Sequence, residues 1–466
     1  MSTLAPSEER PPTPRSDFRR LLASLGSASL TDWLLAAGAG FIAIAFSIAV
    51  LQTVASRPSI LPAFFVAGLL FPLILTRPAW IVPVFLAVTW MWIGQSYFGG
   101  FSPVTLGSFV LLPLAAWYAV KRRLLARETL TVFAFFGLAL VATTILGAGG
   151  GAVTADPFKD LAFLVIAAFC VRSTKDTDRS AVALVVAGIV LGLGAVYSVR
   201  VHPTALFPLD ETRDIYGNLP GGAPRAAGPF GESNFFALSL AVLVPFCLYM
   251  VGQGGRRMLL GIVGVLVLIA GDFAAQSRGG ALAIGFAIVV MGFASKQRRM
   301  RLGALALILA AVPLVIAFGA QISASAGRDV SGRATENQVA LHMFLDHPIA
   351  GVGPGQYPFY YRDYTRKYGN DPRYQREPHS LPLQVAAEQG LVGILAWMGV
   401  GVVLLRFVLA TRVWRDPLGR AIVTAIGAYC VASLFLHGSQ IRLFYVLIGL
   451  LLAHGAAVVR ERAVPG

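Results

Sequence analysis

The sequence predicts an all-α polytopic membrane protein, and three observations lead to this fold class: the composition, the lengths of the apolar runs and the placement of basic residues. Of the 466 residues, 56% are hydrophobic and only 13% are charged, and the mean hydropathy is +0.70. Soluble domains carry about 25% charged residues and could not hide so much apolar surface from water. The composition therefore excludes a soluble enzyme, a disordered chain and a disulfide scaffold.

The helices follow from the apolar runs, because a membrane helix needs about 17–25 predominantly apolar residues. On that criterion we expect about 14 transmembrane helices (12–14). Their predicted ranges are 33–54, 59–76, 79–95, 104–120, 129–147, 157–171, 180–198, 233–251, 258–275, 280–295, 302–320, 389–410, 420–436 and 443–459.

The chain divides into four predicted parts. They are a disordered cytosolic leader (1–31), N-terminal transmembrane helices (32–200), a candidate catalytic region (201–410) and C-terminal transmembrane helices (411–466). Two connections, 199–232 and 321–388, are long, whereas the others are short. Any chemistry must therefore use the membrane helices or these two loops.

Lysine and arginine predict the orientation, because short loops that cross the membrane are poor in them. One alternate set of connections carries the whole net charge of +15, and the other set is neutral. The basic set, which includes both termini, is predicted to be cytosolic, so loops 199–232 and 321–388 are predicted to be external. The basic excess is thus a topology signal and gives no support for nucleic-acid binding.

The sequence contains no motif for a cofactor or a metal. The glycine run Gly149–Gly151 lacks the strand that a phosphate-binding loop needs. Asp176 and Asp178 lie in a short connection between helices, where a solvated loop is the simplest interpretation. An acidic group in loop 199–232 has no convincing ligand spacing. An outward-facing enzyme has no access to cytosolic ATP, NAD or nucleotide sugars, so its donor must already have crossed the membrane.

Two external arginines border the apolar bundle. Arg278 lies in a very short turn before Gly279 and Gly280, and Arg225 lies in a Gly/Pro-rich segment just before a predicted span. Guanidinium groups stay charged and fit phosphate oxygens with two hydrogen bonds, so this pair could clamp a diphosphate. The structural alternative for Arg278 is an arginine at the membrane interface, paired with Asp272.

Loop 321–388 contains the candidate base, His379. A helix is predicted at Glu336–Leu345, a turn follows it, and His379 lies where the loop re-enters the membrane at the start of another helix. A helix N-terminus disfavours imidazolium, and a neutral imidazole can accept the proton of a hydroxyl. A structural histidine is the alternative. Of the other five histidines, His454 is expected to be a packing residue in the last span.

These segments together resemble the O-antigen ligase and polymerase superfamily of bacterial surface-polysaccharide glycosyltransferases. The resemblance runs from about Arg225 to Gly393. Its motifs are Arg225-x-x-Gly-x-Phe-Gly-x-x-Asn234, Ser277-Arg278-Gly279, Ser-Gly-Arg333 before a helix, Asp346-His-Pro-Ile-Ala-Gly-Val-Gly-Pro-Gly-Gln-Tyr357, His379 and Glu388-Gln-Gly-Leu-Val-Gly393. The chain departs from the family at Ser380, where members often have asparagine, and at Asn337, where they often have an aromatic residue.

The resemblance implies a GT-C-type helical bundle in the bacterial inner membrane with a periplasmic active site. The implied reaction transfers a glycan from an undecaprenyl-diphosphate carrier to an acceptor hydroxyl, with inversion and without a metal or cofactor. Arg225 and Arg278, with Arg333 as a third candidate, would bind the donor diphosphate, and His379 would act on the acceptor.

The acceptor remains open. It is lipid A–core in a ligase, another lipid-linked glycan in a polymerase, or a protein in a third variant. A transporter or flippase is the alternative of another class, which would show internal repeats and charges at mid-membrane.

The predicted orientation is testable by chemical labelling. A cysteine introduced at Asn370 is expected to react with a membrane-impermeant maleimide in intact spheroplasts, because loop 321–388 is predicted to be external. A cysteine at Arg462 should react only after lysis. The unsubstituted chain controls for the three native cysteines. Labelling at Arg462 alone in intact spheroplasts would reverse the orientation.

Overall fold

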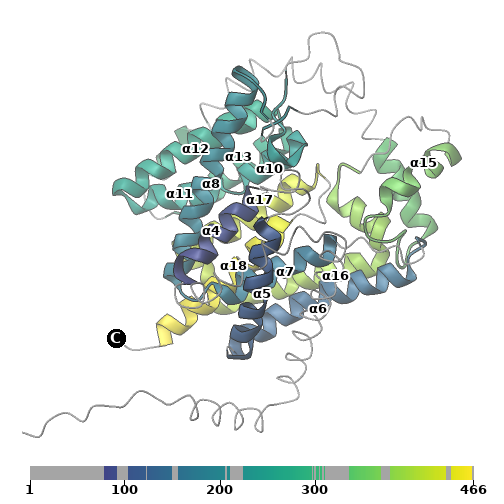
Figure 1. Cartoon of the computed structure of the whole chain (residues 1–466), viewed down its shortest axis with the longest axis horizontal. Helices are drawn as coiled ribbons and strands as arrows, with labels where there is room; N and C mark the ends of the chain where they lie inside the picture. The colour runs from purple at the N-terminus through teal and green to yellow at the C-terminus, as the bar shows by residue number, and fades with distance from the viewer. Residues whose placement is uncertain are drawn as a thin grey trace, which may run out of the picture.

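Figure 1 shows a computed structural model of the chain, in which the described elements are helices. The described residues are 78–91, 103–121, 123–149, 156–204, 207–209, 224–295, 335–368, 378–436 and 442–463, with a few positions between 298 and 309. The predicted leader, the predicted spans 33–54 and 59–76, most of 302–320 and the candidate Arg333 lie outside them.

The bounds of the helices are as follows. The long helices are α4 (Pro78–Trp90), α5 (Pro103–Lys121), α6 (Arg123–Leu146), α7 (Asp156–Cys170), α8 (Thr174–Arg200), α10 (Ser233–Ala241), α11 (Val244–Gln253), α12 (Gly255–Ala275), α13 (Arg278–Ala294), α15 (Tyr357–Lys367), α16 (Leu381–Thr411), α17 (Pro417–Ser433) and α18 (Arg442–Ala463). A further helix covers residues 335–346, and 3-10 turns lie at Gly228–Phe230 and Val413–Arg415.

The predicted spans within the described residues coincide with helices, which confirms the all-α class. Six of the described helical segments are long and apolar enough to cross a membrane. They are Arg127–Leu146, Thr174–Arg200, Ser233–Gln253, Gly255–Ala275, Leu381–Thr411 and Arg442–Ala463. A multi-pass membrane protein is thereby supported, while the number of about 14 spans stays a prediction.

Two predicted spans differ from the observed helices in detail. The span 233–251 is divided into α10 and α11, because Pro245 has no N–H with which to continue the helix. The span 389–410 is the second part of α16, which begins earlier, at Leu381, and is kinked at Gly390. The first part of α16 lies within loop 321–388, which is predicted to be external, and it carries buried polar side chains.

Helix α18 forms the centre of the bundle. In its most apolar 18-residue window 89% of the residues are buried, compared with 28% in α16. Helices α6 and α16 lie side by side at the periphery (Figure 1). Their outward rows of large apolar side chains are the surface that a bilayer would cover.

The helix ends on the side predicted to be cytosolic are joined by arginines. Arg460 donates to the carbonyl oxygen of Arg172 at 2.8 Å, and Arg420 donates to that of Ala294 at 2.6 Å. Ala294 is the last residue of α13, so its carbonyl has no partner within the helix and carries partial negative charge, which a guanidinium balances. Arg172 lies in the connection between α7 and α8, which Arg460 joins to the end of α18. These contacts join helix ends that the predicted alternation assigns to one side.

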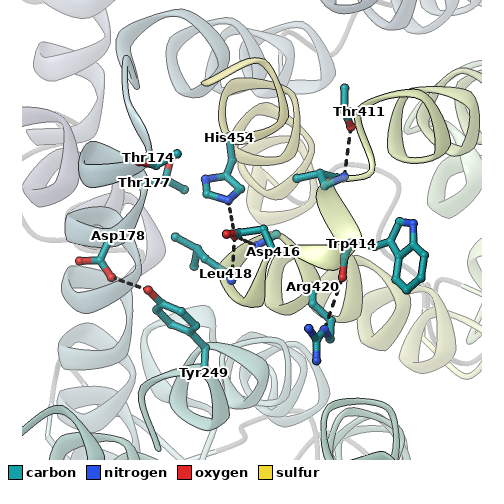
Figure 2. A network of polar contacts seen from close by, with 12 residues as sticks. Thr174, Thr177, Asp178, Tyr249, Thr411, Trp414, Asp416, Leu418, Arg420 and His454 are labelled. Carbon is teal, nitrogen blue, oxygen red and sulfur yellow. Dashed lines mark hydrogen bonds and ion pairs between the residues drawn. The ribbon is translucent and has the colours of Figure 1, made fainter. Parts of the chain in front are cut away.

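The Asp-x-Asp pair is part of this same side and is not a solvated loop. Asp178 accepts hydrogen bonds from both terminal nitrogens of Arg257, at 2.7 and 2.6 Å, and from the Tyr249 hydroxyl at 2.9 Å (Figure 2). Asp176 pairs with Arg179 at 3.3 Å. Asp178 therefore joins the start of α8 to the start of α12, whereas the pair of Asp176 and Arg179 lies within α8.

His454 is buried as expected, but packing is not its only contact. Its Nε2 lies 2.7 Å from Oδ2 of Asp416, which also accepts the backbone N–H groups of Leu418 and Gly419 and so caps α17 (Figure 2). Burial alone would raise the pKa of Asp416, but the His454 hydrogen bond and the two amides hold that pKa below its ordinary value. The pair ties the start of α17 to the centre of α18.

The His454–Asp416 contact should be measurable as stability. His454→Ala is expected to lower the free energy of unfolding by about 1.5–3 kcal/mol, the usual contribution of a hydrogen bond to a charged group. The carboxylate contributes fully above its unfolded pKa of about 3.9, and this contribution is lost as pH falls through the lowered folded value. Thermal unfolding of detergent-purified protein at neutral pH therefore records all of it. Val459→Ala, an exposed change on the same helix, is the control, and equal stability of both variants would contradict the prediction.

Candidate functional site

The described candidate residues belong to two groups of contacts. Arg225 and Arg278 lie at the turn between α12 and α13, which we call the arginine turn (residues 224–234 and 272–280). His379 lies with Glu336 where the external loop meets the start of α16, and we call this contact the histidine–glutamate pair. Connectivity puts both groups at helix ends on the side predicted to be external.

Arg225 closes the C-terminus of α12. Its Nε donates to the carbonyl oxygen of Ala275 at 2.9 Å, and its Nη2 lies 3.3 Å from Oδ1 of Asn234. The neighbouring amide of Ala226 donates to the carbonyl oxygen of Ala274 at 2.9 Å. Arg225 therefore has a structural role that sequence reasoning did not assign, since part of its guanidinium holds the turn in place.

Arg278, in contrast, is exposed and is the first residue of α13. Ser277 caps this helix, because its hydroxyl oxygen accepts the amide of Gly280 at 3.2 Å. An exposed guanidinium beside a capped helix N-terminus creates a region of positive potential, which suits an anionic group. Of the two arginines, Arg278 is better placed to contact a substrate.

A buried carboxyl group explains why the second residue after Arg278, Gly280, is a glycine. Asp272 is only 6% exposed, and a Cβ at Gly280 would collide with its Oδ1 and lie 2.9 Å from the Cβ of Ala237. The close approach predicted from the paired glycines is thus an approach of protein atoms.

The glycine-rich turn of loop 321–388, at Pro348–Gly353, docks onto the kink of α16. Gly390 has a φ of +59°, so Leu391 and Val392 no longer donate to the carbonyls of Ala387 and Glu388. The turn replaces these bonds, as four distances show: Val352 N to Ala387 O, 2.9 Å; Gly353 N to Glu388 O, 2.9 Å; Leu391 N to Pro348 O, 2.8 Å; and Val392 N to Ile349 O, 3.1 Å. The two motifs, 346–357 and 388–393, therefore form one structural unit.

Glycines make this docking possible. A Cβ at Gly351 would collide with the backbone of Glu388, and a Cβ at Gly390 would lie 2.5 Å from the backbone of Ile349. On the other side of the turn, the amide of Gly149 donates to the carbonyl oxygen of Val352 at 2.9 Å. Gly149, the first glycine of the run after α6, thus contacts the turn, a role that the sequence analysis missed.

His379 is positioned by a buried carboxylate. Its Nε2 lies 3.4 Å from Oε2 of Glu336, and the Glu336 side chain is fully buried, whereas that of His379 is 21% exposed. The hydroxyl of Tyr357 donates to the backbone oxygen of Glu336 at 2.7 Å. The predicted helix start beside His379 is confirmed, since α16 begins at Leu381 with Ser380 as its N-cap residue.

Glu336 is a candidate residue that sequence reasoning missed. It was assigned only to the start of a loop helix, because a separation of 43 positions from His379 gives no local sign of contact. A histidine whose ring is oriented by a carboxylate can accept a proton and have its new charge balanced. The other buried glutamate, Glu388, accepts the amide of Tyr357 at 3.4 Å and supports the same region.

In the part of the chain that the structure describes, no group of three or more His, Cys, Asp or Glu side chains is arranged to hold a metal ion.

The comparisons with known proteins agree with the sequence motifs. Residues 263–398 match the family model described as O-antigen ligase, which includes Arg278 and His379 but not Arg225. None of the curated proteins compared matches the chain.

The two arginines are expected to differ in their effect on stability. Arg225→Ala should lower the free energy of unfolding by on the order of 1–2 kcal/mol, because carbonyls at the end of α12 lose their partner. Arg278→Ala should leave it unchanged, because that side chain is exposed. Thermal unfolding of purified protein measures both, with the exposed Arg362→Ala as control. A larger loss in Arg278→Ala than in Arg225→Ala would contradict this assignment.

Proposed function

Because residues 263–398 belong to the O-antigen ligase superfamily, we propose that this protein moves a glycan from an undecaprenyl-diphosphate carrier to an acceptor hydroxyl at the outer face of the bacterial inner membrane. The family supports the coarser statement, a membrane glycosyltransferase of the ligase or polymerase type. The observation that carries the finer proposal is the histidine–glutamate pair, in which a partly exposed imidazole faces a fully buried carboxylate.

The proposed reaction begins at the acceptor. His379 accepts the proton of the acceptor hydroxyl while the hydroxyl oxygen attacks the anomeric carbon of the donor sugar. The bond between that carbon and the diphosphate oxygen breaks, so the configuration inverts and the lipid diphosphate leaves with the bonding electrons. Glu336 holds the imidazole ring and balances the charge that the ring gains.

The arginine turn stabilises the leaving group. Negative charge develops on the diphosphate as the glycosidic bond breaks, and Arg278 offers exposed donors beside a helix N-terminus. Arg225 fixes the turn and adds its positive charge beside the same anion. Arg333, which lies outside the described residues, stays a third candidate. Guanidinium groups in this role do the work that a divalent metal performs in other glycosyltransferases.

The membrane position suits such a donor. A lipid diphosphate holds its charged group at the bilayer surface, and Arg278 and His379 both lie at ends of helices. A GT-C-type fold, a location in the inner membrane and cytosolic termini complete the proposal. The domain is common to ligases and polymerases, so lipid A–core and a second lipid-linked glycan are both acceptors within it.

Transfer by purified protein tests the proposal. His379→Ala is expected to slow transfer about a hundredfold, the typical contribution of a general base, while donor binding is retained. Glu336→Gln should keep the shape of the site and slow transfer by about tenfold, and Arg278→Ala should slow it about a hundredfold, with poor rescue by lysine.

The assay uses reconstituted protein, a lipid-diphosphate glycan and candidate acceptors at saturation. His342→Ala is the matched control, because this external histidine stacks on Tyr368 with ring centroids 3.7 Å apart and has no proposed catalytic role. Near-normal transfer by His379→Ala would remove it from the mechanism. Absence of transfer with every lipid-linked glycan would favour the transporter alternative.

A further inference from the structure

The helix at residues 335–346 has one face that is buried in the protein and one that is exposed and apolar. One face is buried against α15 and contains Glu336, Val339, Ala340 and Met343. The other face exposes Leu341 to 46% and Leu345 to 60%, and an offset of four residues keeps these two side chains on one face. Ile349, in the turn that follows the helix, is 66% exposed, and we call the three residues the leucine stripe.

The neighbouring helix α15 presents a different surface. Its exposed residues include Arg362, Asp363, Arg366 and Lys367. These charges are typical of a helix that faces water. The leucine stripe carries no charge at its three positions, although it belongs to the same external region. Large apolar side chains grouped in this way mark an interaction surface.

The leucine stripe is continuous with the surface that faces the bilayer. Ile349 lies in the turn that is bonded to Val392 of α16 on one side, and Val352 of the same turn is bonded to Gly149 after α6 on the other. Helices α6 and α16 both expose large apolar residues as far as their contacts with this turn. In α6 they are Phe135, Leu138, Val141, Ile145 and Leu146, and in α16 they are Leu391, Leu395, Met398, Val402, Leu405 and Leu409.

From this continuity we propose that the leucine stripe is inserted into the leaflet on its own side of the membrane, among the lipid acyl chains just below the head groups. The helix 335–346 is then an interfacial helix, held on one face by protein and on the other by lipid. Amphipathic helices in such positions bury their apolar face about 5–10 Å deep. In a bilayer, lipid acyl chains cover the exposed apolar side chains of α6 and α16 up to the turn that contains Ile349. The same acyl chains therefore extend over the leucine stripe.

This position has a consequence for the active site, which rests on the proposed function. Glu336 is on the buried face of the inserted helix and contacts His379. The bilayer therefore sets the height of the histidine–glutamate pair above the membrane. An acceptor hydroxyl reacts only when its own anchor brings it to that height, which favours membrane-anchored acceptors over free saccharides.

Fluorescence quenching tests the insertion directly. Single cysteines at Leu341, Leu345 and Ile349, in a chain whose exposed Cys430 is replaced by serine, carry a bimane label in nanodiscs. Lipids brominated near the top of the acyl chains should quench all three labels as strongly as a label at Leu395 of α16. Aqueous iodide should quench them as weakly as it quenches that control, and a label at Arg362 of α15 should show the reverse.

Two results would overturn the proposal. Strong iodide quenching with no effect of brominated lipid would place the stripe in water. Protection from both quenchers, together with a dimeric mass, would assign the stripe to contact with a second copy. Each labelled variant is first required to match the thermal stability of the parent. Quenching needs no turnover, so the outcome is independent of whether the protein transfers glycans.

Discussion

The kink of α16 at Gly390 is the constraint on which the side of the structure predicted to be external depends. It removes two hydrogen bonds from the helix, and the turn at Pro348–Gly353 satisfies the four backbone groups that are set free. Unpaired backbone groups near lipid cost several kcal/mol each, so neither the kink nor the turn is stable without the other. His379 is eleven residues before the kink and Glu336 twelve before the turn. Their contact is therefore fixed by this pairing.

The sequence predicted well those features that depend on runs of neighbouring residues. Long apolar stretches predicted the helices, because length and hydropathy alone determine whether a segment is stable in lipid. The helix ends were predicted less well. The apolar span was predicted to begin only at residue 389, because Gln384, Glu388 and Gln389 are polar, yet all three are buried within protein. Hydropathy does not distinguish a polar side chain in water from one that is paired inside a protein.

Contacts between distant segments could not be predicted from one sequence. Glu336 and His379, Asp178 and Arg257, and Asp416 and His454 are each separated by dozens of positions. Each residue had a simple local interpretation, as a loop helix start, a solvated loop or a packing side chain. Only the fold brings the partners together. The arginine turn was more accessible to prediction, because Arg278 and its glycines are adjacent in the sequence, although the structural use of Arg225 was not.

The arginines near the basic helix ends contribute to two separate steps, insertion into the membrane and packing of the folded bundle. During insertion into the membrane, what counts is positive charge near the end of a span, which lysine supplies equally well. In the finished bundle, Arg420 reaches the last carbonyl of α13 and Arg460 reaches a carbonyl in the connection between α7 and α8, which depends on the length and the planar head of arginine. A lysine at either position would therefore yield chains that are threaded correctly but assembled less tightly. Biogenesis and final packing thus place separate demands on the same few side chains.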